Sequence, residues 1–190
     1  MVTVDDIRNS LNENKNISKE IKANIFELVL VFNSKYPNVS LDRLNEKLKT
    51  IKIVKGSKYV NPRVSEYNIR ENTIYFNMSE IEKGYDMKHI LMFELLNVIT
   101  CGDTFTGFNI ENRFRALNAG YTEIIANYLV GNSGELLVYP EQAVEANLIS
   151  ILIGDEHISK AYFENDVNSL IIGFMKAGVS VWWLIKQEQR

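Results

Sequence analysis

The sequence has very few residues of the kinds that build disulfides and common metal sites: one cysteine and two histidines among 190 residues. A single cysteine, Cys101, excludes an intramolecular disulfide and a zinc site made of several cysteines. It directly follows an apolar helical pattern, which indicates a buried, inert thiol. Phosphate loops, glycine-rich dinucleotide motifs and the G-x-S-x-G elbow are also missing. The sequence therefore gives no sign of a nucleotide-dependent enzyme or a serine hydrolase.

Long uninterrupted apolar runs are missing as well. The most apolar stretch, 167–185, contains Asn168, Lys176 and two glycines, and a central lysine argues against a membrane span. The amino terminus lacks the basic and apolar regions of a signal peptide. A net charge of −3 gives no indication of the basic surface that nucleic-acid-binding proteins carry. We predict a cytoplasmic protein without membrane span or nucleic-acid partner, in which the apolar segment 167–185 leaves room for self-association.

The patterns that are present predict an α+β fold dominated by helices. Residues 1–50 carry apolar side chains at helical spacing. Residues 51–78 contain short strand patterns, two of which flank a turn at 70–72. From residue 86 the chain is helical again, and the length indicates one domain over 1–190. Helix limits are signalled by Asp86 as a cap, by Pro140 as a first residue, and by Gly131 and Gly154 as stops.

One predicted helix, 88–100 with the sequence KHILMFELLNVIT, is apolar nearly all round, yet it contains Glu94 and Asn97. In zinc peptidases of the HExxH type, two histidines four residues apart bind the metal, and the intervening glutamate activates a water molecule. The corresponding pentad here is FELLN, residues 93–97. It keeps the glutamate and has other residues at both histidine positions.

The stretch HILMFELLNVIT resembles the HExxH helix of gluzincin metallopeptidases, and ALNAGYTEIIANYL (116–129) resembles their second motif, N-E-G-x-T-E. Residues 153–171 resemble the C-terminal helices of small gluzincin-like proteins from low-GC bacteria. The resemblance covers about residues 65–175. It implies a zincin-like fold, in which a small sheet precedes the central active-site helix.

Carried over to this chain, the resemblance assigns vestigial roles to individual residues. The three metal-ligand positions are Phe93, Asn97 and Ala119, and Glu94 is the former catalytic glutamate. Asn118 matches the second motif, and Glu123 keeps the place of the carboxylate that braces a ligating histidine. Phenylalanine and alanine have no lone pair to offer, and one carboxamide cannot supply the roughly 10 kcal/mol or more of a zinc site. We therefore predict no zinc, no other cofactor and no hydrolysis by the family mechanism.

Glu94 still needs partners, because an unpaired buried carboxylate is costly. One hypothesis is structural: a hydrogen bond or an ion pair within the core, to a residue among Asn97, Asn118, Thr122, Arg113 and Arg115. A second is a vestigial pocket, open or filled by Phe93, that binds a ligand or peptide. A third is catalysis by Glu94. Burial would raise the pKa of Glu94 unless an arginine lies close by.

The two histidines do not suggest a displaced metal site. His89 lies about 140° around the helix from Glu94, at about 100° per residue, so the two side chains do not converge. His157 stands beside Asp155 and Glu156 in a distal helix and is expected at the surface.

Three functions follow as hypotheses. The leading one is a catalytically inactive metallopeptidase-like protein with a binding or regulatory role toward a protein or peptide partner. The second is a hydrolase with a rebuilt site that uses Glu94 and Glu123. The third is an unrelated α+β interaction module in which Glu94 is only a polar residue of the core.

Overall fold

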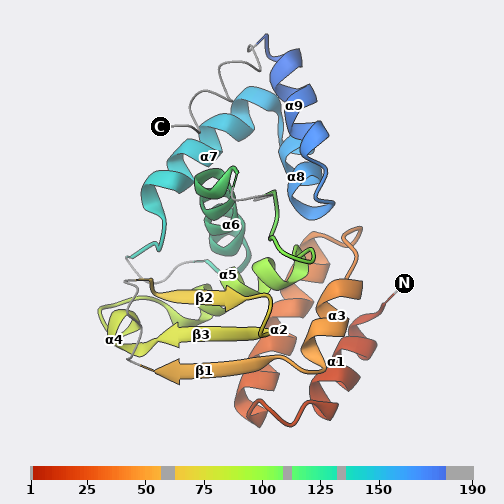
Figure 1. Cartoon of the computed structure of the whole chain (residues 1–190), viewed down its shortest axis with the longest axis vertical. Helices are drawn as coiled ribbons and strands as arrows, with labels where there is room; N and C mark the ends of the chain where they lie inside the picture. The colour runs from red at the N-terminus through yellow and green to blue at the C-terminus, as the bar shows by residue number, and fades with distance from the viewer. Residues whose placement is uncertain (1, 57–62, 109–112, 132–135, 179–190) are drawn as a thin grey trace. The chain divides into compact units, whose positions relative to one another are not determined.

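The computed structural model describes residues 2–56, 63–108, 113–131 and 136–178 (Figure 1). Helices predominate in this part of the chain and one small sheet accompanies them, which confirms the α+β class. The chain divides into two compact units. The first comprises 1–99 and 125–138, and the second 100–124 and 139–190. The organisation as a single domain stays a prediction.

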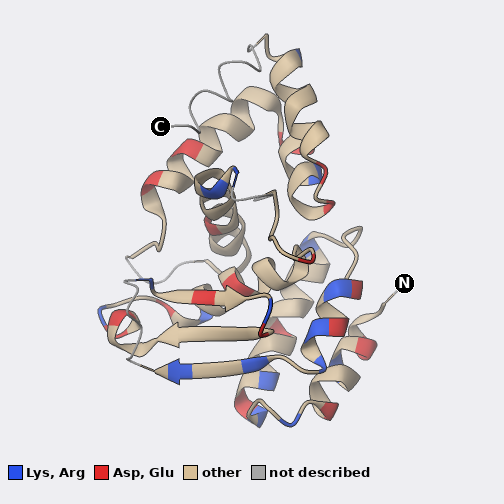
Figure 2. Ribbon diagram, in the orientation of Figure 1, with Lys and Arg blue, Asp and Glu red and all other residues tan. Residues whose placement is uncertain are grey.

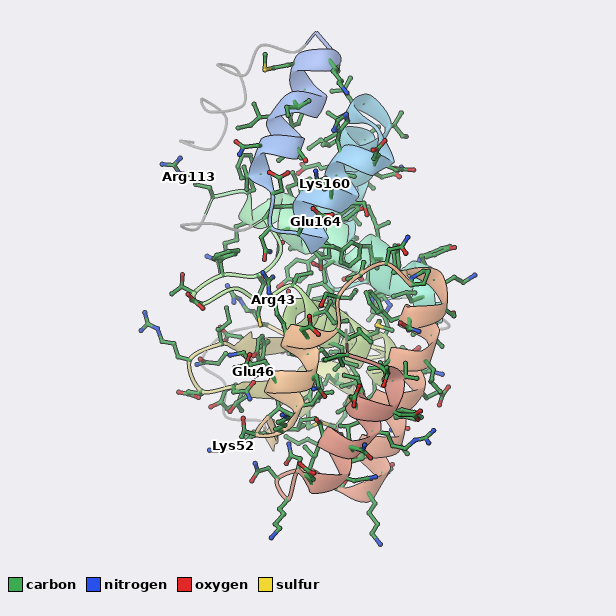
Figure 3. All side chains as sticks on the ribbon, turned by 90° about the vertical axis from the view of Figure 1, so that its right-hand side faces the viewer. Arg43, Glu46, Lys52, Arg113, Lys160 and Glu164 are labelled. Carbon is green, nitrogen blue, oxygen red and sulfur yellow. The ribbon has the colours of Figure 1, made fainter. Side chains whose placement is uncertain are left out.

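Three helices begin the first unit: α1 (Val4–Glu13), α2 (Lys19–Lys35) and α3 (Asp42–Leu48). The Thr3 side chain caps α1 and the Ser18 side chain caps α2 by accepting backbone N–H bonds. α1 packs against both α2 and α3. Their shared core consists of aliphatic and aromatic side chains at helical spacing: Ile7, Leu11, Ile25, Leu28, Phe32, Leu44 and Leu48. Arg43 and Glu46 project from the exposed side of α3 (Figure 3).

The sheet has three strands in the order β1-β3-β2: β1 (Lys52–Gly56), β2 (Ser65–Asn68) and β3 (Thr73–Asn77). β2 and β3 form an antiparallel hairpin, so the turn predicted at 70–72 is confirmed. β1 pairs with β3 in parallel, with Ile53 opposite Ile74. β1 is thus an edge strand, and its Lys52 and Lys55 are exposed, as befits an edge that must not recruit another strand.

The short helix α4 (Met78–Ile81) leads to α5 (Met87–Ile99), the helix predicted at 88–100. The Asp86 carboxylate accepts the Lys88 backbone N–H at 2.8 Å, which confirms the predicted cap. Ten of the thirteen α5 side chains are buried, and the helix packs against α2, α3 and β2. A helix that is apolar all round belongs in a core, so α5 lies at the centre of the first unit.

The second unit is built from helices: the first part of α6 (Arg115–Val130), then α7 (Pro140–Ile153), α8 (Asp155–Phe163) and α9 (Val167–Lys176). The predicted limits at Gly131, Pro140 and Gly154 are confirmed. Tyr162 is fully buried at its centre, and its ring centroid lies 5.5 Å from that of Phe108 and 5.2 Å from that of Tyr121.

No helix among the described residues is long and apolar enough to cross a membrane. Part of the apolar segment predicted to leave room for self-association, residues 179–185, lies outside the described residues.

Candidate functional site

Glu94 projects from the middle of α5 and is 1% exposed. Side chains alternate between the two faces of a strand, and in β2 the buried positions are Ser65 and Tyr67. Since α5 packs against β2, the buried face of this strand supplies polar groups to the Glu94 carboxylate.

Three donors surround that carboxylate. The Ser65 hydroxyl donates to Oε1 at 2.5 Å, and the Asn97 side-chain amide donates to Oε2 at 3.0 Å. The Tyr67 backbone N–H also donates to it. Asn97 was among the partners expected from the sequence, because residues three apart share a helical face. Ser65 and Tyr67 were not expected, since no local pattern links a strand residue to a helix residue 29 positions further on.

Burial raises the pKa of Glu94 from 4.5 to about 7. The charged form loses its hydration in the core, and the nearby Glu66 carboxylate disfavours a second negative charge. The hydrogen bonds from Ser65, Asn97 and Tyr67 favour the charged form and oppose this rise. The upward direction agrees with the expectation for a buried carboxylate.

The residues at the positions that the resemblance assigns to metal ligands do not fit zinc. Phe93 is buried in α5, Asn97 is half-buried and donates its amide to Glu94, and Ala119 is half-buried in α6. Phe93 and Ala119 have no donor atom, and the chemistry of the three positions is not that of a zinc site. Among the described residues, no group of three or more His, Cys, Asp and Glu side chains could hold a metal ion.

The second motif, 118–123, is used for packing inside the second unit. Asn118 accepts the Phe108 backbone N–H at 3.2 Å, and the Thr122 hydroxyl lies 2.7 Å from the Tyr162 hydroxyl. A Cβ atom on Gly120 would lie 1.9 Å from the Gln142 carbonyl oxygen. This glycine therefore lets the backbones of α6 and α7 approach closely. Asn118 and Thr122, two of the partners considered for Glu94, thus have partners of their own.

The loop 100–108 is held by two asparagines, Asn118 of this motif and Asn165 between α8 and α9. Asn165, in a left-handed conformation with φ 56°, donates its side-chain amide to the carbonyls of Thr100 at 3.0 Å and Gly107 at 2.6 Å. Gly107 has φ 55°, and a Cβ atom there would lie 2.0 Å from Asn118 Oδ1. Neither asparagine bond was visible in the sequence, although Asn is among the few residues that adopt a positive φ readily.

The remaining candidates from the sequence divide between the units. Glu123 is 1% exposed and belongs to the second unit, whereas Glu94 belongs to the first. Arg113 and Arg115, considered as ion-pair partners of Glu94, are exposed residues of the second unit, and the Arg113 side chain extends away from the ribbon (Figure 3). His89 is buried in α5, and the half-exposed His157 lies with Nε2 3.3 Å from Lys176 Nζ.

What the site can do chemically is limited by its burial. A carboxylate with a pKa about 7 has the right protonation for a general acid or base at neutral pH. Its two oxygens, however, already accept bonds from Ser65, Asn97 and Tyr67 inside the core. Comparisons with models of protein families, with curated proteins and with solved structures find no match to this chain, so its function is inferred from the residues of the site.

Proposed function

We propose that this protein is a catalytically inactive, metallopeptidase-like protein that works by binding a protein or peptide. In this proposal it keeps a zincin-like arrangement of sheet and helix, and the former catalytic glutamate, Glu94, holds α5 to β2. The observation that carries the proposal is the buried Glu94 carboxylate with its donors Ser65 and Asn97.

A catalytic glutamate needs access to the molecule that it deprotonates. A general base has to reach the proton of a water or substrate within hydrogen-bonding distance. Glu94 is 1% exposed, and its oxygens already accept bonds from Ser65 and Asn97. The amide of Asn97, at the position of the second histidine, is engaged in one of these bonds. The side chains at 93, 97 and 119 therefore favour a structural role for Glu94 over chemistry.

The order of elements supports the zincin-like part of the proposal. The sheet β1-β3-β2 precedes α5 in the chain, and α5 packs against β2. The second motif follows in α6, where Asn118, Gly120 and Thr122 are all engaged in packing or hydrogen bonds. In this proposal, these packing and hydrogen-bonding roles explain why the three residues were kept after the metal was lost.

Two alternative functions remain proposals. A hydrolase rebuilt on Glu94 and Glu123 is favoured by the pKa of Glu94 near neutrality, and opposed by the burial of both carboxylates. An unrelated α+β interaction module would explain the packing of α5 equally well, but it would leave the order of the two motifs unexplained.

Restoring the three ligands tests the proposal. In the variant Phe93→His/Asn97→His/Ala119→Glu, we expect stoichiometric zinc by mass spectrometry of the metal content, while the wild-type chain contains none. The matched control replaces Ala119→Glu by Ala119→Gln, which keeps nearly the same shape but removes the carboxylate ligand. Circular dichroism establishes that each variant is folded.

The outcomes separate the three functions. Zinc in the wild-type chain that disappears in Glu94→Gln would refute the loss of the metal site and favour the rebuilt hydrolase. A folded triple variant that binds no zinc would refute the zincin-like arrangement and leave the unrelated interaction module.

A further inference from the structure

The outer side of α7 carries a row of exposed aliphatic side chains: Val144, Leu148, Ile151 and Leu152, between 50% and 73% exposed. Their spacing of four, three and one residues places them within an arc of about 100° on one side of the helix. The other side of α7, with Ala143, Ala146, Ser150 and Ile153, is buried. We call the exposed row the α7 stripe.

Packing among the described residues does not explain the α7 stripe. α7 already contacts α8 and α9 in the second unit, through a face that is separate from the stripe. A helix at the surface normally turns charged or polar residues outward. Clustered exposed aliphatic residues on a protein surface mark sites of interaction.

Charge distinguishes between the partners that this stripe fits. From 140 to 156 the sequence contains Glu141, Glu145, Asp155 and Glu156 and no lysine or arginine. Glu141 and Glu145 each stand three residues before a member of the stripe, and the other two carboxylates follow the end of α7. Figure 2 shows acidic positions along α7 without basic ones. Glu141 and Glu145 therefore place negative charge beside the stripe. Glu156 and Asp155, whose carboxylate accepts the Ser150 hydroxyl on the buried side of α7, add negative charge after its end.

A second copy of this chain fits the stripe poorly. In an antiparallel pair of α7 helices, Glu141 and Glu145 of one copy approach Asp155 and Glu156 of the other. In a parallel pair each glutamate approaches its own equivalent. Both arrangements therefore bring like charges together across the interface, which disfavours association. The four side chains offer on the order of a few hundred Å², less than the roughly 800 Å² per partner of a stable interface. In any stable complex at this stripe, polar contacts around the apolar side chains must supply the remaining buried area.

We infer that the α7 stripe binds an amphipathic helix of another protein, whose apolar face is flanked by lysine or arginine residues. Helix-on-helix recognition of this kind uses anchors on one helical face, at i, i+3, i+4 and i+7. The α7 stripe likewise occupies one face, at i, i+4, i+7 and i+8. Basic residues on the partner would pair with Glu141 and Glu145. The α7 stripe belongs to the second unit and the buried Glu94 to the first, so binding at the stripe does not depend on the proposed function.

The test uses the full chain and two synthetic peptides of the length of α7, 14 residues. Both carry the same leucine stripe, with lysine at the remaining positions of one and glutamate at those of the other. By titration calorimetry we expect the leucine–lysine peptide to bind about ten-fold or more tightly than the leucine–glutamate peptide. Leu148→Ser/Ile151→Ser should weaken its binding about ten-fold or more, and Glu141→Gln/Glu145→Gln roughly three-fold, with a smaller dependence on salt.

The control removes two exposed aliphatic side chains from the first unit by Leu30→Ser/Val54→Ser, at positions 43% and 40% exposed. It should leave binding unchanged. Equal binding of both peptides, no binding of either, or equal loss in the control would overturn the inference. Light scattering supplies a further readout: a wild-type dimer that dissociates in Leu148→Ser/Ile151→Ser would identify a second copy as the occupant and would also overturn it.

Discussion

Two opposing effects set the charge of Glu94. Ser65, Asn97 and the Tyr67 backbone all donate to the carboxylate and so favour its ionised form. Burial of the whole group outweighs them and holds the pKa at about 7, against 4.5 for the unperturbed residue. Glu94 thus has hydrogen-bond donors for its carboxylate. Its ionised form nevertheless destabilises the folded state, because the donors do not fully replace the water lost on burial.

The pH dependence of stability follows from this shift. Between pH 4.5 and about 7 the folded chain keeps a proton on Glu94 that the unfolded chain has released. The contribution to stability is fully present below pH 4.5, decreases as the pH rises and is lost above about 7, a change of about 3 kcal/mol. Glu94→Gln is uncharged at every pH. We expect this variant to gain up to about 3 kcal/mol relative to wild type between pH 5 and pH 8.

Urea unfolding at both pH values measures this difference. Glu46→Gln, at an exposed position of α3, removes a carboxylate from the surface and serves as the control. An unchanged pH dependence in Glu94→Gln would contradict both the raised pKa and the burial of the carboxylate.

At the scale of elements, close approach between helices depends on single small residues. Gly120 of α6 faces the backbone of Gln142 in α7, where an added Cβ would lie 1.9 Å from the carbonyl oxygen. A backbone atom cannot rotate away as a side chain can, so α6 and α7 would have to separate. The glycine that matches the second motif is therefore explained by packing in the second unit.

Gly120→Ala should accordingly destabilise the protein, although alanine usually stabilises a helix by about 1 kcal/mol relative to glycine. We expect the free energy of unfolding to fall by about 1–3 kcal/mol, as is typical of overpacking. Gly56→Ala provides the control, because nothing lies within 4 Å of the Cβ that it would add. A Gly120→Ala variant as stable as wild type would show that the α6–α7 approach is looser than described.

At the scale of the whole molecule, the proposal implies that folding does not depend on a metal. A protein whose native state binds a metal is stabilised by that binding, and chelation lowers its melting temperature. We expect a chelator such as EDTA to change the melting temperature of this protein by less than about 1 °C, a shift that corresponds to well under 1 kcal/mol. The restored triple variant is the positive control, since it should lose stability on chelation.

Differential scanning fluorimetry with and without EDTA gives this measurement. A decrease of several degrees in the melting temperature of the wild-type chain would contradict the proposal that this protein binds no metal.

The sequence by itself determined the features that neighbouring residues control. Pro140 and Gly154 mark the limits of α7, and Asp86 caps α5, because capping and chain reversal act over one turn of helix. The apolar surroundings of Glu94 likewise indicated a central helix. That Phe93, Asn97 and Ala119 stand at the ligand positions of a former zinc site stays a prediction from the resemblance.

Only the tertiary structure decided which distant groups meet. The parallel pairing of β1 with β3 joins strands that are separated in the chain by β2. The bond from Ser65 to Glu94 spans 29 residues, and that from Asn165 to Thr100 spans 65. No local pattern encodes such pairs, because they result from the packing of whole elements. For that reason the sequence indicated that a buried Glu94 needs hydrogen-bond partners, whereas only the structure identified Ser65 and Tyr67 as two of them.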